Sequence, residues 1–179
     1  MATYRSGTTR LIWLFAVMVL AGLYALNFFP IFLLVAVSLA TSFAINRMHV
    51  RSVGVEFVLI SSVVAGIAYG PWAGALTALA LMSFHVAVAN YIGPYIIWVI
   101  PEYALAGFLA GMVHWDPVTL GVSMALMVNA MGLFFTFMFN RGFLGHYLPY
   151  AITNVIFNFL VFRAAAPAIL AWMGIYGFA

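Results

Sequence analysis

The sequence has very few charged residues. Only 5% of its 179 residues are Asp, Glu, Lys or Arg, and it contains neither lysine nor cysteine. Soluble domains carry about 25% charged residues, so a water-soluble globular domain is excluded. Without cysteine, the chain has no disulfide scaffold, no thiol nucleophile and no thiolate metal ligand. The net charge of +3 is too small for a nucleic-acid-binding surface, which needs a basic stripe.

The sequence has long apolar runs in place of charge, and 68% of its residues are hydrophobic. A helix crosses the hydrocarbon in about 20 residues, and lipid tolerates no unpaired backbone groups. Turn residues divide the runs, so we predict an all-α, polytopic integral membrane helical bundle with seven transmembrane helices in a single domain. The number of transmembrane helices falls to six if the first two apolar runs form one tilted helix and one re-entrant segment that does not cross the membrane. The expected spans are residues 11–28, 29–46, 53–69, 71–89, 95–113, 118–139 and 148–173.

The arginines predict how the chain is oriented in the membrane. Cytoplasmic loops carry an excess of basic residues. With seven spans, five of the six arginines fall on one side, which we predict to be the cytoplasmic side of a cell membrane: Arg5, Arg10, Arg47, Arg51 and Arg141. The other side carries Asp116 and no loop arginine.

Several polar residues are expected at membrane depth, where an ionisable group is costly and is a functional candidate. Glu102 lies about eight residues into the fifth span, or roughly 12 Å, which places it near the midplane. Arg163 lies in the last span, where it either pairs with Glu102 or extends its guanidinium to the nearer interface. Asn129 and Asn158 are expected at a depth similar to Glu102, and they either bridge helices or line a cavity. These four residues are the predicted ligand-binding site.

Other polar residues suggest less specific roles. Asn154 lies one turn before Asn158 and shares its helix face. Glu56 lies near Arg51, and we expect a solvated contact between them at the interface. The histidines lack metal-ligand spacing, so no metal site is expected: His49, His85, His114 and His146. No catalytic triad or carboxylate pair stands out, so we expect neither an enzyme nor a cofactor.

Small residues recur at a spacing of four on three of the expected helices. The stripes are Gly66, Gly70 and Gly74; Gly107 and Gly111; and Ala36, Ala40 and Ala44. In lipid, close backbone approach across small residues is a main source of helix association. Each stripe therefore serves either packing within this bundle or docking of another membrane protein.

From Val53 onward, the layout resembles the substrate-binding S component of energy-coupling factor (ECF) vitamin transporters. GIAYGPWAGAL is similar to the aromatic-Gly-Pro-x-x-Gly junction between two helices of that family. EYALAGFLAGMV resembles the small-residue helix that follows, and YLPYAITNVIFNFLVF resembles the last helix, which carries asparagines. The likeness covers approximately residues 29–172.

The resemblance implies a six-helix bundle that holds a vitamin or a metal-related ligand near the extracellular side. It implies partners as well, namely a transmembrane coupling protein and two ATPases. The alanine stripe of Ala36, Ala40 and Ala44 would match the family's contact with the coupling protein. Two features depart from the family: the additional run at 11–28, and the arginines beside the 46–52 loop, which the family places outside.

Two functions remain open. The resemblance implies an integral membrane subunit of a transporter that binds a vitamin-like small molecule. The apolar helices are equally typical of a structural or accessory transmembrane subunit of a larger membrane protein complex. A channel or proton path would rest on Glu102 alone. The chain has no Walker-type phosphate loop, so uphill transport would need a partner or an ion gradient.

Overall fold

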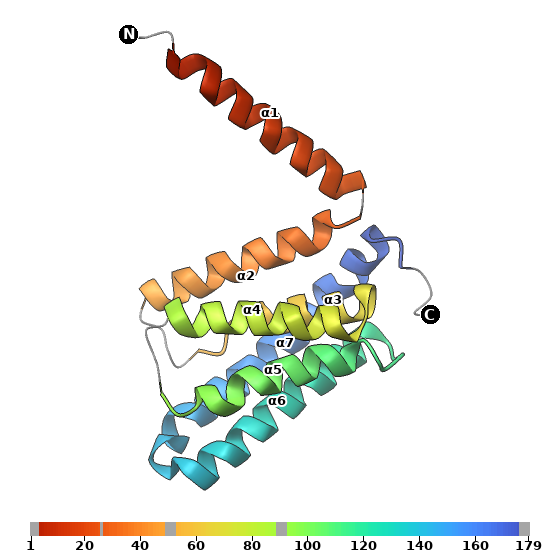
Figure 1. Cartoon of the computed structure of the whole chain (residues 1–179). Helices are drawn as coiled ribbons and strands as arrows, with labels where there is room; N and C mark the ends of the chain where they lie inside the picture. Colours follow the sequence, from red (N-terminus) through yellow and green to blue (C-terminus); the bar gives the residue numbers. More distant parts are fainter. Residues whose placement is uncertain (1–3, 26, 49–52, 89–92, 176–179) are drawn as a thin grey trace.

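The computed structural model describes residues 4–25, 27–48, 53–88 and 93–175. Within these ranges all regular secondary structure is helical, which confirms the predicted all-α fold (Figure 1). The elements are α1 (Tyr4–Ala25), α2 (Phe29–Arg47), α3 (Val58–Tyr69), α4 (Pro71–Val88), α5 (Ile96–Ala110), α6 (Pro117–Phe139), the 3₁₀ helix η1 (Arg141–Phe143) and α7 (Leu144–Trp172).

Helices α2 to α7 form an antiparallel bundle, and α1 extends away from it (Figure 1). Helix α1 meets the bundle at α2, and its apolar side chains are largely uncovered; Phe15, for example, is 70% exposed. Helix α3 runs through the bundle interior, where every residue from Val58 to Gly66 is buried and α2, α4, α5, α6 and α7 all contact it. A helix that is apolar on all sides is expected to be enclosed in this way.

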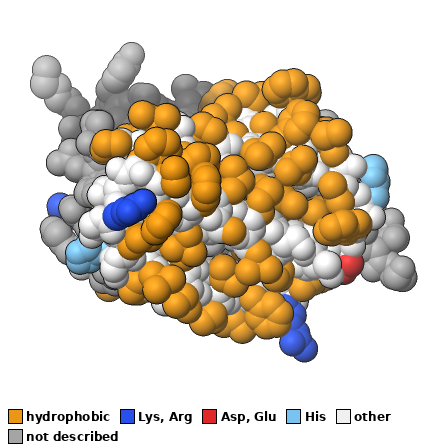
Figure 2. All heavy atoms as spheres, turned by 90° about the horizontal axis from the view of Figure 1, so that it is seen from below, with side chains coloured by type: hydrophobic (Ala, Val, Ile, Leu, Met, Phe, Trp, Pro, Cys, Tyr) orange, Lys and Arg blue, Asp and Glu red, His pale blue; other side chains and the backbone are white. Residues whose placement is uncertain are grey.

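Four of the described helical segments are long and apolar enough to cross a membrane: α2, α4, α6 and the segment formed by η1 and α7. The apolar part of α1, together with α3 and α5, is shorter. The face in Figure 2 is mostly hydrophobic, with a few isolated charged side chains, as expected of a surface that contacts lipid. The structure therefore supports a membrane protein, and the number of crossings stays a prediction.

Some predicted boundaries differ from the helix ends. The first predicted span, 11–28, continues past the end of α1 at Ala25, and α1 itself begins at Tyr4 because the polar residues before position 11 are helical as well. The last helix begins at Leu144, before the start of the predicted span 148–173, because η1 makes the turn within three residues. Pro149 then lies in the second turn of α7, and proline is more frequent in membrane helices than in soluble ones.

The third helix begins at Val58, so the prediction that residues 53–57 are helical is also wrong. The backbone of this segment bonds to α7: the Gly54 N–H donates to Thr153 Oγ1 (2.8 Å), and Asn154 Nδ2 donates to the Gly54 carbonyl (3.0 Å). A Cβ at position 54 would overlap the backbone of Tyr150. Non-helical backbone is tolerated at membrane depth where protein groups satisfy it, which explains how the segment can leave the helical path.

The glycine stripes bring α3, α4 and α5 into backbone contact. A Cβ on Gly107 would overlap the Gly74 carbonyl, and a Cβ on Gly66 would lie too close to the Gly107 carbonyl. Gly111 packs in the same way against the turn at Gly70, whose φ of 96° is one that L side chains rarely adopt. These glycines therefore serve packing within the bundle.

The bundle end where α2 finishes and α7 begins carries Arg47 and Arg141, and we call it the arginine end (Figure 1). Arg51 lies outside the described residues. Arg5 and Arg10 lie in α1, but their side chains also fall outside the description. The side of the membrane that this end faces stays a prediction.

Candidate functional site

A network of hydrogen bonds inside the bundle is centred on Asn154 of α7. Its Nδ2 donates to the Gly54 carbonyl (3.0 Å) and to Glu56 Oε1 (3.3 Å). Its Oδ1 accepts from Asn129 Nδ2 (2.8 Å) and from Asn158 Nδ2 (3.2 Å). All three asparagines are buried. Because Asn154 uses both its donor and its acceptor ends, the network fixes its orientation and ties segment 53–57 and α6 to α7.

Glu56 belongs to this network and caps α3. Its Oε2 accepts a hydrogen bond from the Leu59 N–H (3.0 Å), one of the donors left free at a helix N-terminus. Its Oε1 also accepts from the Tyr103 hydroxyl (3.3 Å). The side chain is only 2% exposed. The predicted solvated position of Glu56 is therefore wrong, because segment 53–57 enters the bundle instead of extending α3 towards the interface.

Glu102 of α5 is the most unusual group in the interior. Its side chain is 1% exposed, and neither carboxylate oxygen has a hydrogen-bond partner among the described residues. Tyr147 of α7 lies close enough to interact with it electrostatically. Buried polar atoms nearly always have partners, so a buried carboxyl group without one calls for a functional explanation.

Three tyrosines lie around the two acidic residues. Tyr103 and Tyr150 both lie close enough to Glu56 to interact with it electrostatically. The Tyr147 hydroxyl fits against Gly132 of α6, where a Cβ would overlap it. We call Glu56, Glu102, Tyr103, Tyr147 and Tyr150 the acid–tyrosine cluster. It lies towards the arginine end, because α3 and α5 begin there and α7 supplies its first turns (Figure 1).

The predicted site residues are only partly brought together. Asn129 and Asn158 both donate to Asn154 and so belong to one network. Glu102 is buried, but no described residue forms a hydrogen bond with its carboxylate.

Of the two alternatives given for Arg163, the pairing with Glu102 is wrong. Arg163 is exposed on the outer face of α7. The buried face of that helix has a spacing of four, through Asn154, Asn158, Phe162 and Ala166. Arg163 directly follows Phe162 and is therefore rotated about 100° away from this face.

Several residues of the hydrogen-bond network were not included in the predicted ligand-binding site. Asn154 is the centre of the network, and the sequence feature that indicates it is the pair of asparagines one turn apart on α7. The tyrosines gave a weaker signal, since Tyr147 and Tyr150 are three residues apart on a helix face while Tyr103 lies next to Glu102.

The alanine stripe of α2 lies largely outside the bundle. Ala40 and Ala44 are exposed and Ala36 is half-buried. The buried face of α2 is a different one, formed by Pro30, Leu34, Ser38 and Ser42. The stripe is therefore accessible to a neighbouring molecule, and its role in docking stays a prediction.

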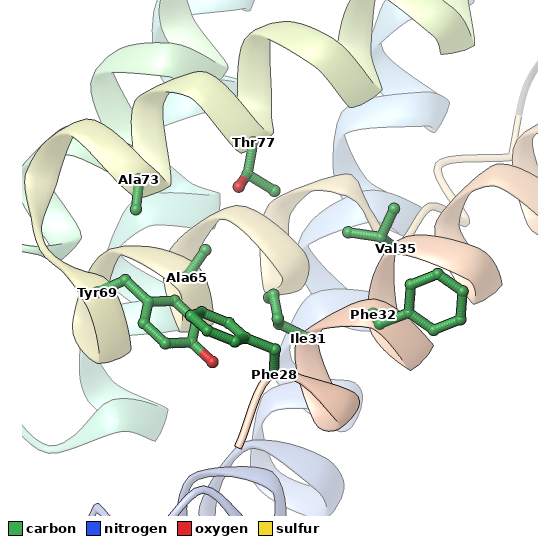
Figure 3. Close-up of a pocket in the computed structure, with 8 residues that line it drawn as sticks. All are labelled: Phe28, Ile31, Phe32, Val35, Ala65, Tyr69, Ala73 and Thr77. Atoms are coloured by element: carbon green, nitrogen blue, oxygen red, sulfur yellow. The ribbon is translucent and has the colours of Figure 1, made fainter. Parts of the chain in front are cut away.

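An apolar groove of about 520 Å³ lies elsewhere, between α2 and the helices α3 and α4 (Figure 3). The rings of Phe28 and Tyr69 stack in it with centroids 4.9 Å apart, and the Tyr69 hydroxyl donates to the Asn27 carbonyl (3.0 Å). Its lining residues are Phe28, Ile31, Phe32, Val35, Ala65, Tyr69, Ala73 and Thr77. With no charged residue in the lining, the groove offers little to recognise a polar ligand.

Within the described residues, no group of three or more His, Asp or Glu side chains is placed to hold a metal ion. Comparison with protein-family models, with curated proteins and with solved structures gives no match to this chain.

Proposed function

We propose that this protein is an integral membrane subunit that binds a vitamin-like small molecule, in the manner of the S component of an ECF transporter. The observation that carries the proposal is Glu102, a buried carboxyl group of which neither oxygen has a hydrogen-bond partner in the described structure. The other buried side-chain atoms without a partner are single oxygens of Ser38 and Asn158, which carry no charge. A bound molecule would give the Glu102 oxygens the donors that buried acceptors need.

The chemistry of the acid–tyrosine cluster indicates what kind of ligand would fit. A carboxylate favours a cation or a group with N–H donors. Tyrosine rings offer faces that attract cations, and their hydroxyls donate or accept hydrogen bonds. We therefore expect a small molecule with an ammonium group, a cationic heterocycle or an amide. Asn129 and Asn158 would support the site through Asn154, whose position they fix.

The proposal includes partners and an orientation. A coupling subunit and two ATPases would drive transport, since the chain has no phosphate loop of its own. The exposed Ala40 and Ala44 offer a surface where the coupling subunit could dock. We propose that the arginine end faces the cytoplasm, since Arg47 and Arg141 lie at this end. This orientation puts the acid–tyrosine cluster towards the cytoplasmic side and so departs from the extracellular ligand position that the resemblance implies.

Ligand-dependent thermal stability tests the proposal. The full chain, purified in mild detergent, is screened against organic ammonium compounds, cationic heterocycles and neutral vitamins. A ligand at about 100 times its Kd contributes about 2.7 kcal/mol, which raises Tm by about 5 °C or more. We expect such a rise for one compound class in the wild type and in Asp116→Asn, and its loss in Glu102→Gln. No rise with any compound, or an equal rise in Glu102→Gln, would contradict the proposal.

A second function is a structural or accessory subunit of a larger membrane complex, and the position of α1 favours it. The described side chains of this helix, residue 9 and residues 12–22, are mostly exposed, as expected if a partner covers them. Mass determination after extraction in mild detergent separates the two functions. A stoichiometric complex that is lost on deletion of residues 1–25, together with no ligand response, supports the accessory role.

A further inference from the structure

Arg163 occupies an unusual position on α7. Its side chain is exposed on the outer face of a helical segment that is long and apolar enough to cross a membrane. It lies nine residues before Trp172, which ends the helix, and this corresponds to roughly 14 Å. With Trp172 at the membrane interface, that distance corresponds to a Cα deep in the hydrocarbon, where an arginine on the lipid side is costly. Arginine does not escape this cost by losing its proton.

This chain does not supply a counter-charge for Arg163. It has three acidic side chains in all. Glu56 and Glu102 are buried in the interior, and Asp116 caps the start of α6 with hydrogen bonds to Thr119. A second copy of the chain would meet the same limit, because it presents no acidic side chain on the outer surface at membrane depth. A counter-charge at the depth of Arg163 would therefore have to come from a different molecule.

The surface next to Arg163 is suited to close contact with a helix. Ala164, Ala168 and Ala171 are exposed beside it, and small side chains allow another backbone to approach closely. Larger apolar side chains, including Ile156 and Leu160, continue the same face towards the arginine end. An apolar surface that contains one charge and a patch of small residues fits an apolar helix that contains one opposite charge.

We propose that the outer face of α7 around Arg163 docks a transmembrane helix of a different protein, which bears an Asp or Glu at the depth of Arg163 and forms an ion pair with it. The surface is separate from the acid–tyrosine cluster, which lies inside the bundle. The proposal therefore stands or falls independently of whether the cluster binds a small molecule.

Site-specific crosslinking tests this docking surface. A photo-reactive residue replaces Ala164 in the full chain in its native membrane, and a control places it at Leu126, which is exposed on α6. We expect a discrete adduct from position 164 with a membrane protein that has an acidic residue within a transmembrane segment. Arg163→Leu should lower the yield of this adduct about tenfold or more, and Arg163→Lys should largely retain it.

Exchanging the two charged residues between the proteins tests the ion pair itself. Arg163→Glu should abolish the adduct, and changing the partner's acidic residue to arginine should restore it, which also shows that the variant folds. The proposal is overturned if Arg163→Leu leaves the yield unchanged, if the adduct contains a second copy of this chain, or if the exchange restores nothing. Crosslinking to lipid alone would overturn it as well, because the guanidinium would then reach a lipid phosphate instead of a protein partner.

Discussion

Replacing Asn154 with alanine should destabilise the protein more than any other single change in the polar network. The variant loses two hydrogen bonds that the amide donates and two that it accepts. Hydrogen bonds between membrane helices contribute about 0.6 kcal/mol on average, so these four together amount to about 2 kcal/mol. The Gly54 carbonyl and Glu56 also lose a donor while buried, which adds about 1–3 kcal/mol. We therefore expect the free energy of unfolding to fall by about 3–5 kcal/mol.

The measurement is reversible unfolding of the purified protein in mixed micelles, with increasing denaturing detergent and helix content as the readout. Ile156→Ala is the matched control, because Ile156 lies on the same helix and is 55% exposed. Surface changes of this kind usually shift stability by about 0.5 kcal/mol. A double-mutant cycle with Asn129→Ala then isolates the bond between the two amides.

The reasoning would be refuted if Asn154→Ala cost no more than Ile156→Ala. It would equally be refuted if the effects of the Asn154 and Asn129 substitutions were strictly additive, because residues that share a hydrogen bond should show coupling. Hydrogen exchange gives an independent check. The Gly54 N–H, which donates to Thr153, should lose protection in Asn154→Ala because segment 53–57 loses its anchor on α7.

Two further predictions concern packing and capping. Gly107→Ala should lower the free energy of unfolding by about 1–3 kcal/mol, because the added Cβ meets the α4 backbone, which is not free to move aside. Gly22→Ala on α1 should cause no loss, since nothing lies within 4 Å of its added Cβ; equal effects of the two changes in the same unfolding assay would contradict the proposed packing. Asp116→Ala should cost about 0.5–2 kcal/mol, because the side chain accepts from the Thr119 N–H (2.8 Å), whereas Asp116→Asn should retain most of this stability. An identical Tm for the alanine and asparagine variants would argue against the cap.

The breaks between helices were largely predictable because their causes are local. Pro30 lies in the first turn of α2, where its missing N–H costs nothing. Gly70 permits a backbone angle that other residues disfavour, and Pro71 then starts α4. Asp116 caps the N-terminus of α6 and Pro117 is the first residue of that helix, and both roles are typical of these residue types at a helix start.

Segment 53–57 was not predictable from local sequence because its backbone partners are distant. Thr153 and Asn154, which bond to Gly54, follow it by 99 and 100 residues. The apolar character of the segment favours a helix until those partners are known. The burial of Glu56 follows from the same long-range contacts, so the expected solvated position of its side chain was incorrect.

The sequence predicted which polar residues belong to the candidate site better than it predicted how they are arranged. Glu102, Asn129 and Asn158 are all buried, while their depth in the membrane stays a prediction. Depth alone does not determine which face of a helix a residue occupies. Arg163 illustrates this limit, since a single residue separates it from the buried Phe162, and the four-residue spacing through Asn154 and Asn158 would have placed it on the outer face.

Native mass spectrometry of the full chain, released from its own membrane, tests most directly whether Glu102 holds a small molecule. We expect the wild-type protein to carry an additional mass of a few hundred daltons, and the isosteric Glu102→Gln variant, expressed and folded to the same extent, to have lost it. A wild-type protein of unmodified mass, or the same adduct on both proteins, would show that Glu102 does not hold a small molecule.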